Sequence, residues 1–331
     1  MSNLTFPLLL HSYIYYCKIN LIIILNYKYF VGGLSLMGNY VITCCSTVDL
    51  TKEQLEAINV KYICFNFELD GVPRKDDLYT SISPNELYTA MANGSDTKTS
   101  QVSIGEYIDF FTPFLKDGKD ILHVCLSSGI SGTYNSALLA KDQLVDEFPD
   151  RKIYIIDSLA ASSGYGLLIA EAADKRDEGL DIDALYQWIE DNKLNVHHWF
   201  FSSDLTFFIK GGRISKAAGL VGSVLKICPL MNVDNTGHLI PREKIRTKKK
   251  SIKAMVDTML EHVDNGKNYT GRCYMSHSNC YEDAKEVAEL IEEAIPNLRN
   301  KIVINNIGAT IGSHTGPGTV ALFFIGDKRT N

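Results

Sequence analysis

The sequence lacks an uninterrupted apolar run long enough to span a membrane. Its most apolar early stretches lie at residues 8–10 and 21–25, and polar residues such as Lys18 and Asn20 interrupt the segment between them. A spanning helix needs about 18 or more apolar residues in succession. A secretory signal would begin with basic residues and end at a small-residue cleavage site, and neither pattern is clear. A membrane anchor stays the alternative interpretation of this segment.

Met37 offers a simpler explanation of the residues before it. It immediately precedes residues 38–43, which have the pattern of a first strand. We hypothesise that the natural protein starts at Met37 and that residues 1–36 are an upstream in-frame extension outside the fold. The intact mass of the native protein tests this, because a mass that includes Met1 contradicts it.

The chain also lacks an excess of positive charge and a paired-cysteine motif. It has 33 lysines and arginines against 39 aspartates and glutamates, so its formal net charge is -6. That balance argues against nucleic acid as the main partner. The 8 cysteines lie mostly within apolar runs, and Cys44-Cys45 does not have the C-x-x-C spacing of a redox site. Reduced thiols in a cytoplasmic protein fit this pattern better than a disulfide framework.

Motifs for nucleotide, hydrolase and metal chemistry are missing as well. The sequence has no P-loop, no carboxylate cluster typical of a metal–nucleotide site, and no serine in a G-x-S-x-G elbow. Cys273, His277 and Cys280 lie close together, as do His197 and His198. No fourth residue has the spacing of a zinc knuckle, so we expect no metal and no cofactor.

The 331 residues are enough for two domains. After Met37, short apolar runs alternate with helical segments, which is typical of a parallel sheet covered on both faces. Thr51 and Gln54 offer a cap and its reciprocal acceptor for the first helix. We predict a three-layer α/β/α domain over residues 37–195. Its strands are expected at residues 40–44, 61–69, 121–126 and 152–156, and its helices at 52–57, 86–91, 104–115, 134–147 and 164–177.

Residues 196–331 have a different order of elements and are predicted to form a second α/β domain with a mixed sheet. A hairpin-like turn is expected at residues 235–237. The strands are expected at residues 199–203, 230–233, 272–276, 301–305 and 319–325, and the helices at 252–263 and 281–294.

One short segment combines the features of an anion cradle. Residues 127–132, Ser-Ser-Gly-Ile-Ser-Gly, follow an apolar run and precede a segment with helical spacing. Glycines let the backbone approach a ligand closely, and a helix N-terminus presents unpaired N–H groups. By itself this segment fits a phosphate as well as a carboxylate.

Other segments carry polar or charged side chains whose roles are open from the residues alone. Residues 46–49 follow the first strand and read either as a ligand edge or, more simply, as a helix cap. Residues 97–101 are interpreted as a polar loop whose hydroxyls donate to an anion or cap a helix. The glycine-rich segment 308–318 contains His314, which we expect to be exposed at a strand end and able to donate to a carboxylate. The basic residues between 242 and 253 form either a solvated face or a docking surface.

Taken together, these segments resemble the DegV family of fatty-acid-binding proteins. The resemblance runs through residues 40–329 and rests on motifs that follow one another in the family's order. They are residues 46–50, 99–101, 127–133, 157–158 with 164–168, 211–216, 243–249 and 311–318. It implies a two-domain protein that encloses one long-chain fatty acid between its domains. It also implies a separate kinase that phosphorylates the bound carboxylate to an acyl phosphate, so the protein itself is a carrier rather than an enzyme.

The resemblance also assigns roles to individual residues. Arg246 matches a basic residue near the pocket mouth, and Arg213 is its plausible neighbour in the 211–216 motif. The residues that match carboxylate-binding positions, or lie beside them, are Thr99, Ser127, Ser128 and His314. One departure stands out, because Cys45 replaces an aspartate of the family, which removes a charge and implies a different local network.

Two other functions compete with the carrier. In the first, Ser128 is the nucleophile of a lipid hydrolase, His314 its base, and Asp49 or Asp157 the orienting acid. In the second, the protein is a lipid sensor without a kinase partner. Transient contact with a membrane surface is compatible with each of these functions, and a monomer is the simplest expectation.

Overall fold

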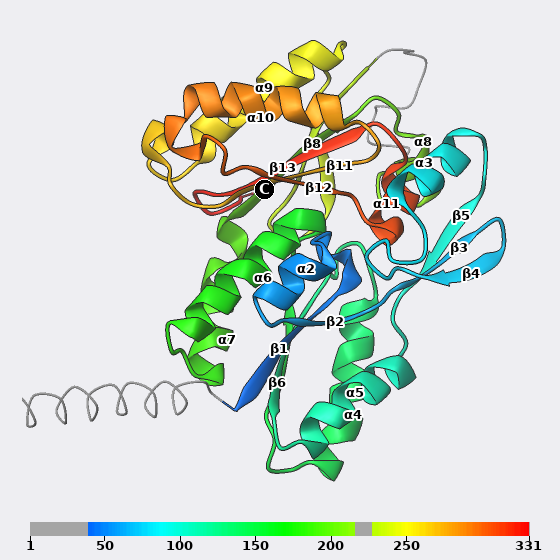
Figure 1. The fold of residues 1–331 in the computed structure, drawn as a ribbon, viewed down its shortest axis with the longest axis vertical. Helices are drawn as coiled ribbons and strands as arrows, with labels where there is room; N and C mark the ends of the chain where they lie inside the picture. Colours follow the sequence, from blue (N-terminus) through cyan, green and yellow to red (C-terminus); the bar gives the residue numbers. More distant parts are fainter. Residues whose placement is uncertain (1–38, 216–226, 331) are drawn as a thin grey trace, which may run out of the picture.

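The computed structural model describes residues 39–215 and 227–330 (Figure 1). The predicted extension at 1–36 lies outside the described residues, so the hypothesis about Met37 stays a prediction. No helix within the described ranges has both the length and the apolar character that crossing a membrane requires.

The first sheet is entirely parallel, as the alternation of strands and helices predicted. Its strand order is β2-β1-β6-β7. Helices α4 and α5 pack on one side of it, and α6 and α7 lie on the other (Figure 1). The strands are β1 (Tyr40–Cys45), β2 (Lys61–Ile63), β6 (Asp120–Cys125) and β7 (Ile153–Asp157). The helices are α2 (Lys52–Ala57), α3 (Pro84–Ala92), α4 (Ile104–Lys116), α5 (Thr133–Glu147), α6 (Ser162–Asp177) and α7 (Ile182–Asn192).

Three of these helices begin with the same reciprocal cap. The Thr51 hydroxyl accepts the backbone N–H of Gln54, whose side chain accepts the N–H of Thr51, which confirms the predicted start of α2. Ser83 and Ser103 do the same with glutamates three residues on. Each cap satisfies N–H groups that a helix leaves unpaired and contributes about 1 kcal/mol.

A small antiparallel sheet departs from the prediction. The expected strand at 61–69 divides at residues 64–65, because the backbone N–H of Phe65 donates to the Ser46 hydroxyl instead of continuing the parallel ladder. Its second part, residues 66–69, forms the central strand β3 of a separate sheet in the order β4-β3-β5. Residues 97–100, interpreted as a loop, form one of its two edge strands. The three strands are β3 (Asn66–Leu69), β4 (Val72–Lys75) and β5 (Thr97–Ser100).

The third sheet is mixed, as predicted for the second half. Its order is β10-β9-β8-β13-β11-β12, and only the pair β11–β12 is parallel. The strands are β8 (Val196–Ser202), β9 (Leu230–Val233), β10 (Leu239–Glu243), β11 (Cys273–His277), β12 (Val303–Asn306) and β13 (Thr319–Ile325). The remaining α-helices are α8 (Thr206–Lys210), α9 (Lys248–His262), α10 (Tyr281–Ala294) and α11 (Ala309–Thr315). The parallel first sheet and this mixed sheet confirm the predicted α/β fold class.

Helix α6 joins the two large sheets. It packs on β8, β11 and β13 from the face opposite α9 and α10, and most of its residues are buried (Figure 1). Small residues make this approach possible, since a Cβ at Gly164 would lie 2.4 Å from Nε2 of His198. The domain boundary expected between residues 195 and 196 falls immediately before β8 and stays a prediction.

Candidate functional site

A pocket lies between the two large sheets and the small sheet. It encloses about 1030 Å³ of space not occupied by atoms, open solvent at its mouth included. Both halves of the chain contribute to its walls, and aliphatic and aromatic side chains predominate. The apolar residues are Phe65, Leu126, Ile130, Ala161, Phe200, Phe208, Val233, Leu239, Ile307, Ile311, Ala321 and Phe323.

Two polar residues of the pocket lining, far apart in the sequence, bond each other. Thr99 on β5 and His314 on α11 form a hydrogen bond of 2.7 Å between Oγ1 and Nε2. The prediction that His314 is exposed at a strand end is wrong. Its glycine-rich segment forms a short helix that begins after Gly308 and ends at Gly316, and this helix carries the imidazole into the pocket wall.

Helix α11 is held tightly against the small sheet and α3. The hydroxyls of Tyr79 and Tyr88 both donate to the carbonyl of Ile307, which directly precedes the helix. Asp76 accepts the backbone N–H of Thr310 at 3.0 Å. The position of α11, which carries His314, is therefore fixed by hydrogen bonds other than the one between His314 and Thr99.

Arg213 supplies a positive charge at the same part of the pocket. Its Nε and one terminal nitrogen donate to the Ile130 carbonyl at 3.2 and 3.0 Å, and the other terminal nitrogen donates to the Gly211 carbonyl at 2.6 Å. Burial lowers the pKa of Arg213, but a guanidinium keeps its charge in proteins. The side chain is thus fixed between the segment after β6 and the segment after α8.

His314 is neutral near pH 7. Burial, and then the charge of Arg213, lower the pKa of His314 to about 4. Its Nδ1 is buried and has no hydrogen-bond partner among the described residues. Gly211 allows this placement, because a Cβ there would lie only 2.3 Å from that nitrogen.

Ser127 and Ser128 are placed differently from Thr99 and His314. The Ser127 hydroxyl is buried and donates to the Gly237 carbonyl at 2.9 Å, so it links the segment after β6 to the turn between β9 and β10. Ser128 is exposed, and neither residue lines the pocket. Ser131 and Gly132 from the same cradle do line it, at the start of α5. Arg246 is exposed and outside the lining.

The groups of a serine hydrolase are not assembled in this structure. His314 bonds Thr99 rather than Ser128. Asp157 accepts the backbone N–H of Ser128 at 3.1 Å, and Asp49 accepts from the hydroxyl of Ser162. None of these bonds activates the Ser128 hydroxyl, so the described geometry does not support this alternative.

Cys45 lies in a buried polar network, and its difference from the network of the family stays a prediction. Its Sγ lies 3.4 Å from the Tyr107 hydroxyl and 3.7 Å from Nε2 of His123, all three buried. Burial raises the pKa of this thiol, but hydrogen bonds from Cys125 and His123 outweigh it and hold the pKa well below its usual range. None of these four residues lines the pocket.

Two further polar lining residues have roles that sequence reasoning missed. Gln101 lies beside the cradle and donates to Ser136 at 2.8 Å. The sequence suggests His198 only as a candidate metal ligand, whereas its side chain lines the pocket. Its Nδ1 lies 2.9 Å from the Val196 carbonyl, and burial lowers its pKa well below the usual range. Successive side chains of a strand point to opposite faces, so the position of His197 and His198 on one strand already indicates that only one of them can face the pocket.

An apolar pocket with a hydroxyl, an imidazole and a guanidinium in its wall is chemically suited to an amphipathic ligand with an anionic head. The DegV family model matches residues 40–327, so the chain belongs to the DegV family.

Relatives support the family and its fold. A DegV domain-containing protein of Clostridium perfringens is 36% identical over 293 residues, which cover 88% of this chain and 99% of the relative. The structure of a DegV family protein from Thermus thermophilus, described for its fatty acid binding, is 25% identical with a TM-score of 0.76 and covers 87% of this chain and 99% of its own. The structure of the fatty acid kinase (Fak) B3 protein of Streptococcus pneumoniae, loaded with linoleic acid, is 24% identical and has a TM-score of 0.73. The match covers 87% of this chain and 99% of that protein. This last likeness shows the fold alone.

Proposed function

We propose that this protein binds one long-chain fatty acid, with its hydrocarbon chain in the pocket and its carboxylate at Thr99, His314 and Arg213. The observation that carries the proposal is the convergence of these three side chains at the wall of an otherwise apolar pocket. The fatty acid binding described for the Thermus relative supports the same ligand class.

The pocket wall accounts for binding of the hydrocarbon chain. About 15 methylenes at roughly 0.8 kcal/mol each give at most about 12 kcal/mol of gross transfer free energy. A cavity between two sheets can collect most of that, whereas a surface groove leaves much of the chain in water. The phenylalanines and aliphatic side chains of the lining supply the contacts.

The three polar side chains account for binding of the head group. A guanidinium has five N–H donors, and Arg213 uses three of them on backbone carbonyls, which leaves two for a carboxylate. When Nε2–H of the neutral His314 ring donates to the Thr99 hydroxyl, that hydroxyl keeps its own proton to donate to the carboxylate, so His314 orients the donor. A buried carboxylate needs such donors, because leaving it unpaired costs several kcal/mol.

Presentation of the carboxylate to a separate kinase is the second part of the proposal. The sequence has no nucleotide motif, so a partner must bring the nucleotide and its magnesium. The name of the Streptococcus pneumoniae protein links this fold to fatty acid kinase. In this scheme exposed Arg246 contacts the partner rather than the ligand. A cytoplasmic location, favoured by 7 free cysteines among the described residues, belongs to the same proposal.

Native mass spectrometry of the purified full chain tests fatty acid binding. We expect a co-purifying fatty acid, and about tenfold weaker binding of oleate by Thr99→Val, which keeps the shape but loses the hydroxyl. Thr112→Val is the matched control, since Thr112 lies on α4 outside the pocket. Protein that neither carries nor binds a fatty acid contradicts the proposal.

Two further assays separate the carrier from its competitors. Turnover of an acyl ester that is lost in Ser128→Ala would instead establish the hydrolase. Acyl-phosphate formation with a fatty acid kinase and ATP separates the carrier from a sensor. If fatty acid binds but no kinase accepts it, the sensor function replaces the kinase part of the proposal.

A further inference from the structure

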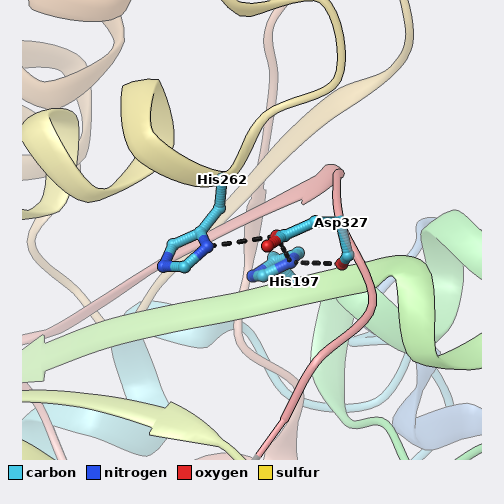
Figure 2. Close-up of side chains that lie close together, drawn as sticks. All are labelled: His197, His262 and Asp327. Atoms are coloured by element: carbon cyan, nitrogen blue, oxygen red, sulfur yellow. Dashed lines mark hydrogen bonds and ion pairs between the residues drawn. The ribbon is translucent and has the colours of Figure 1, made fainter.

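A second group of polar side chains lies on the mixed sheet that contains β8 and β13, on the face opposite the pocket. His197 on β8, His262 at the end of α9 and Asp327 after β13 gather there (Figure 2). Among residues 39–215 and 227–330, this is the only group of three or more histidine, cysteine or acidic residues whose ligand atoms lie within 4.8 Å of one another. The proposed fatty acid function does not use it.

The three side chains converge on one carboxylate oxygen. Asp327 Oδ1 lies 3.0 Å from Nε2 of His197 and 3.1 Å from Nδ1 of His262 (Figure 2). Ligand atoms at 2.0–2.1 Å from a tetrahedral zinc ion are about 3.3 Å apart, so the two N···O distances need to change by only a few tenths of an ångström. The two imidazole rings stack with an interplanar angle of 22°, so one of them must also turn for both nitrogens to face the ion. Imidazole nitrogen and carboxylate oxygen are a usual ligand set for zinc.

Backbone hydrogen bonds hold the three residues in place before any ion binds. The N–H of Asp327 donates to the carbonyl of His262 at 3.0 Å, and the N–H of Gly326 donates to the carbonyl of Asn195 at 2.9 Å. One side of the site is buried and the other is open to solvent, because the side chain of His197 is 5% exposed and that of Asp327 is 63% exposed. Water can therefore complete the coordination.

Charge also favours a cation here. His262 is the last residue of α9, a helix of 15 residues, where the helix dipole is negative. Two neutral imidazoles and one carboxylate carry a net charge of −1, which a divalent ion more than offsets. We propose that His197, His262 and Asp327 form a binding site for a divalent transition-metal ion of the zinc type, which ties the end of α9 to the central strands of the large sheet.

Two hydrogen bonds of His197 oppose this coordination, and the second gives a specific test. Nε2 of His197, the nitrogen that would bind the ion, lies 2.8 Å from the backbone carbonyl of Asp327, a bond that zinc would have to replace. Nε1 of Trp199 donates to Nδ1 of His197 at 3.4 Å, which places the ring proton of neutral His197 on Nε2. A zinc ion on Nε2 would move that proton to Nδ1, against the Trp199 N–H. A bond of 3.4 Å is at the long limit, so little is lost when it breaks. Trp199→Phe removes the opposing donor and should tighten zinc binding.

Titration of the purified full chain with zinc, in competition with a chromogenic chelator, tests the proposal. We expect one zinc ion per chain, at least about 100-fold weaker binding in His262→Gln and Asp327→Asn, and binding as in the unmodified chain in His238→Ala. His238 is an exposed histidine outside the group, so it controls for adventitious surface binding. Cobalt gives an independent readout, because a tetrahedral site produces a visible absorption band that these two variants should lose.

Each other outcome overturns the proposal. No competition for zinc by the unmodified chain, or equal binding by His262→Gln, shows that the group is only a hydrogen-bonded cluster. Zinc that survives both substitutions but is lost in Cys280→Ser shows that a cysteine binds it instead. His262 and Asp327 are partly exposed, so both variants should fold, and thermal unfolding without metal verifies this.

Discussion

Gly211→Ala tests the fatty acid head-group site with a single methyl group. Gly211 ends α8 with a right-handed helical backbone, which alanine adopts without strain. Its added Cβ would lie 2.3 Å from Nδ1 of His314, whereas ordinary contacts begin at 3.4 Å. The imidazole must therefore move by about 1.1 Å, the difference between these distances, and lose its alignment with Thr99. The substitution acts on His314 without removing any polar atom.

The expected loss follows from the hydrogen bond that the Thr99 hydroxyl gives to the ligand, since a displaced imidazole no longer orients that hydroxyl. A hydrogen bond to a charged group contributes about 1.5 kcal/mol or more, so oleate should bind about tenfold more weakly. Stability should fall by about 1–3 kcal/mol, because the added methyl group overpacks against the buried imidazole. Displacement of a fluorescent fatty acid measures the affinity, and thermal unfolding measures the stability.

Gly105→Ala is the matched control. Gly105 lies in α4, and a Cβ there meets nothing within 4 Å. We expect this variant to bind oleate as the unmodified chain does. If Gly211→Ala is folded and binds oleate within about twofold of the unmodified chain, His314 does not orient a donor to the carboxylate and the proposed site is wrong.

Three further predictions concern charge. Arg213→Gln should weaken oleate binding about 10- to 100-fold in a displacement assay, and unchanged affinity would exclude Arg213 from the head-group site. Because the pKa of His314 falls from about 6.5 to about 4 on folding, stability should decrease as pH falls through this window, by up to about 3 kcal/mol. His314→Gln should remove part of that decrease in urea unfolding measured from pH 7 to pH 4, and an identical pH profile would contradict the buried neutral imidazole. Burial, and more weakly the neighbouring Asp76, raise the pKa of Asp49 well above its ordinary value, so its carboxyl group destabilises the fold as pH rises through that range. Asp49→Asn should be about 1–3 kcal/mol more stable than the unmodified chain at pH 8 and equal to it at pH 4, and equal stability at both pH values would contradict this.

The sequence predicted the fold class because its strongest signals are local. The caps at Thr51 and the apolar run before Ser127 mark a helix and a strand by themselves. The division of residues 61–69 was not visible, since it depends on a bond from Phe65 to Ser46, far away in the sequence. The strand at 97–100 was missed because its residues are polar, and only pairing with β3 orders them.

The candidate site shows the same limit. His314 and Thr99 were singled out by motif, but that they bond each other depends on how α11 packs on the small sheet. The group proposed to bind zinc could not be predicted, because His197, His262 and Asp327 are separated by long stretches of sequence and meet only in the folded sheet. Spacing rules detect ligands that are close in sequence, as with Cys273 and His277.

The tyrosine bonds to Ile307 have a kinetic consequence. They join the segment before α11 to α3 and to the segment between β4 and α3, and Thr97 on β5 donates to the carbonyl of Ser313 on α11 at 3.3 Å. Thr99 and His314 are therefore positioned before a ligand arrives, and the entropy of ordering them is lost during folding rather than during binding. The head group then contributes the same increment for every fatty acid. Differences in residence time among fatty acids should come from the hydrocarbon chain alone and lengthen by a constant factor for each added methylene until the pocket is full.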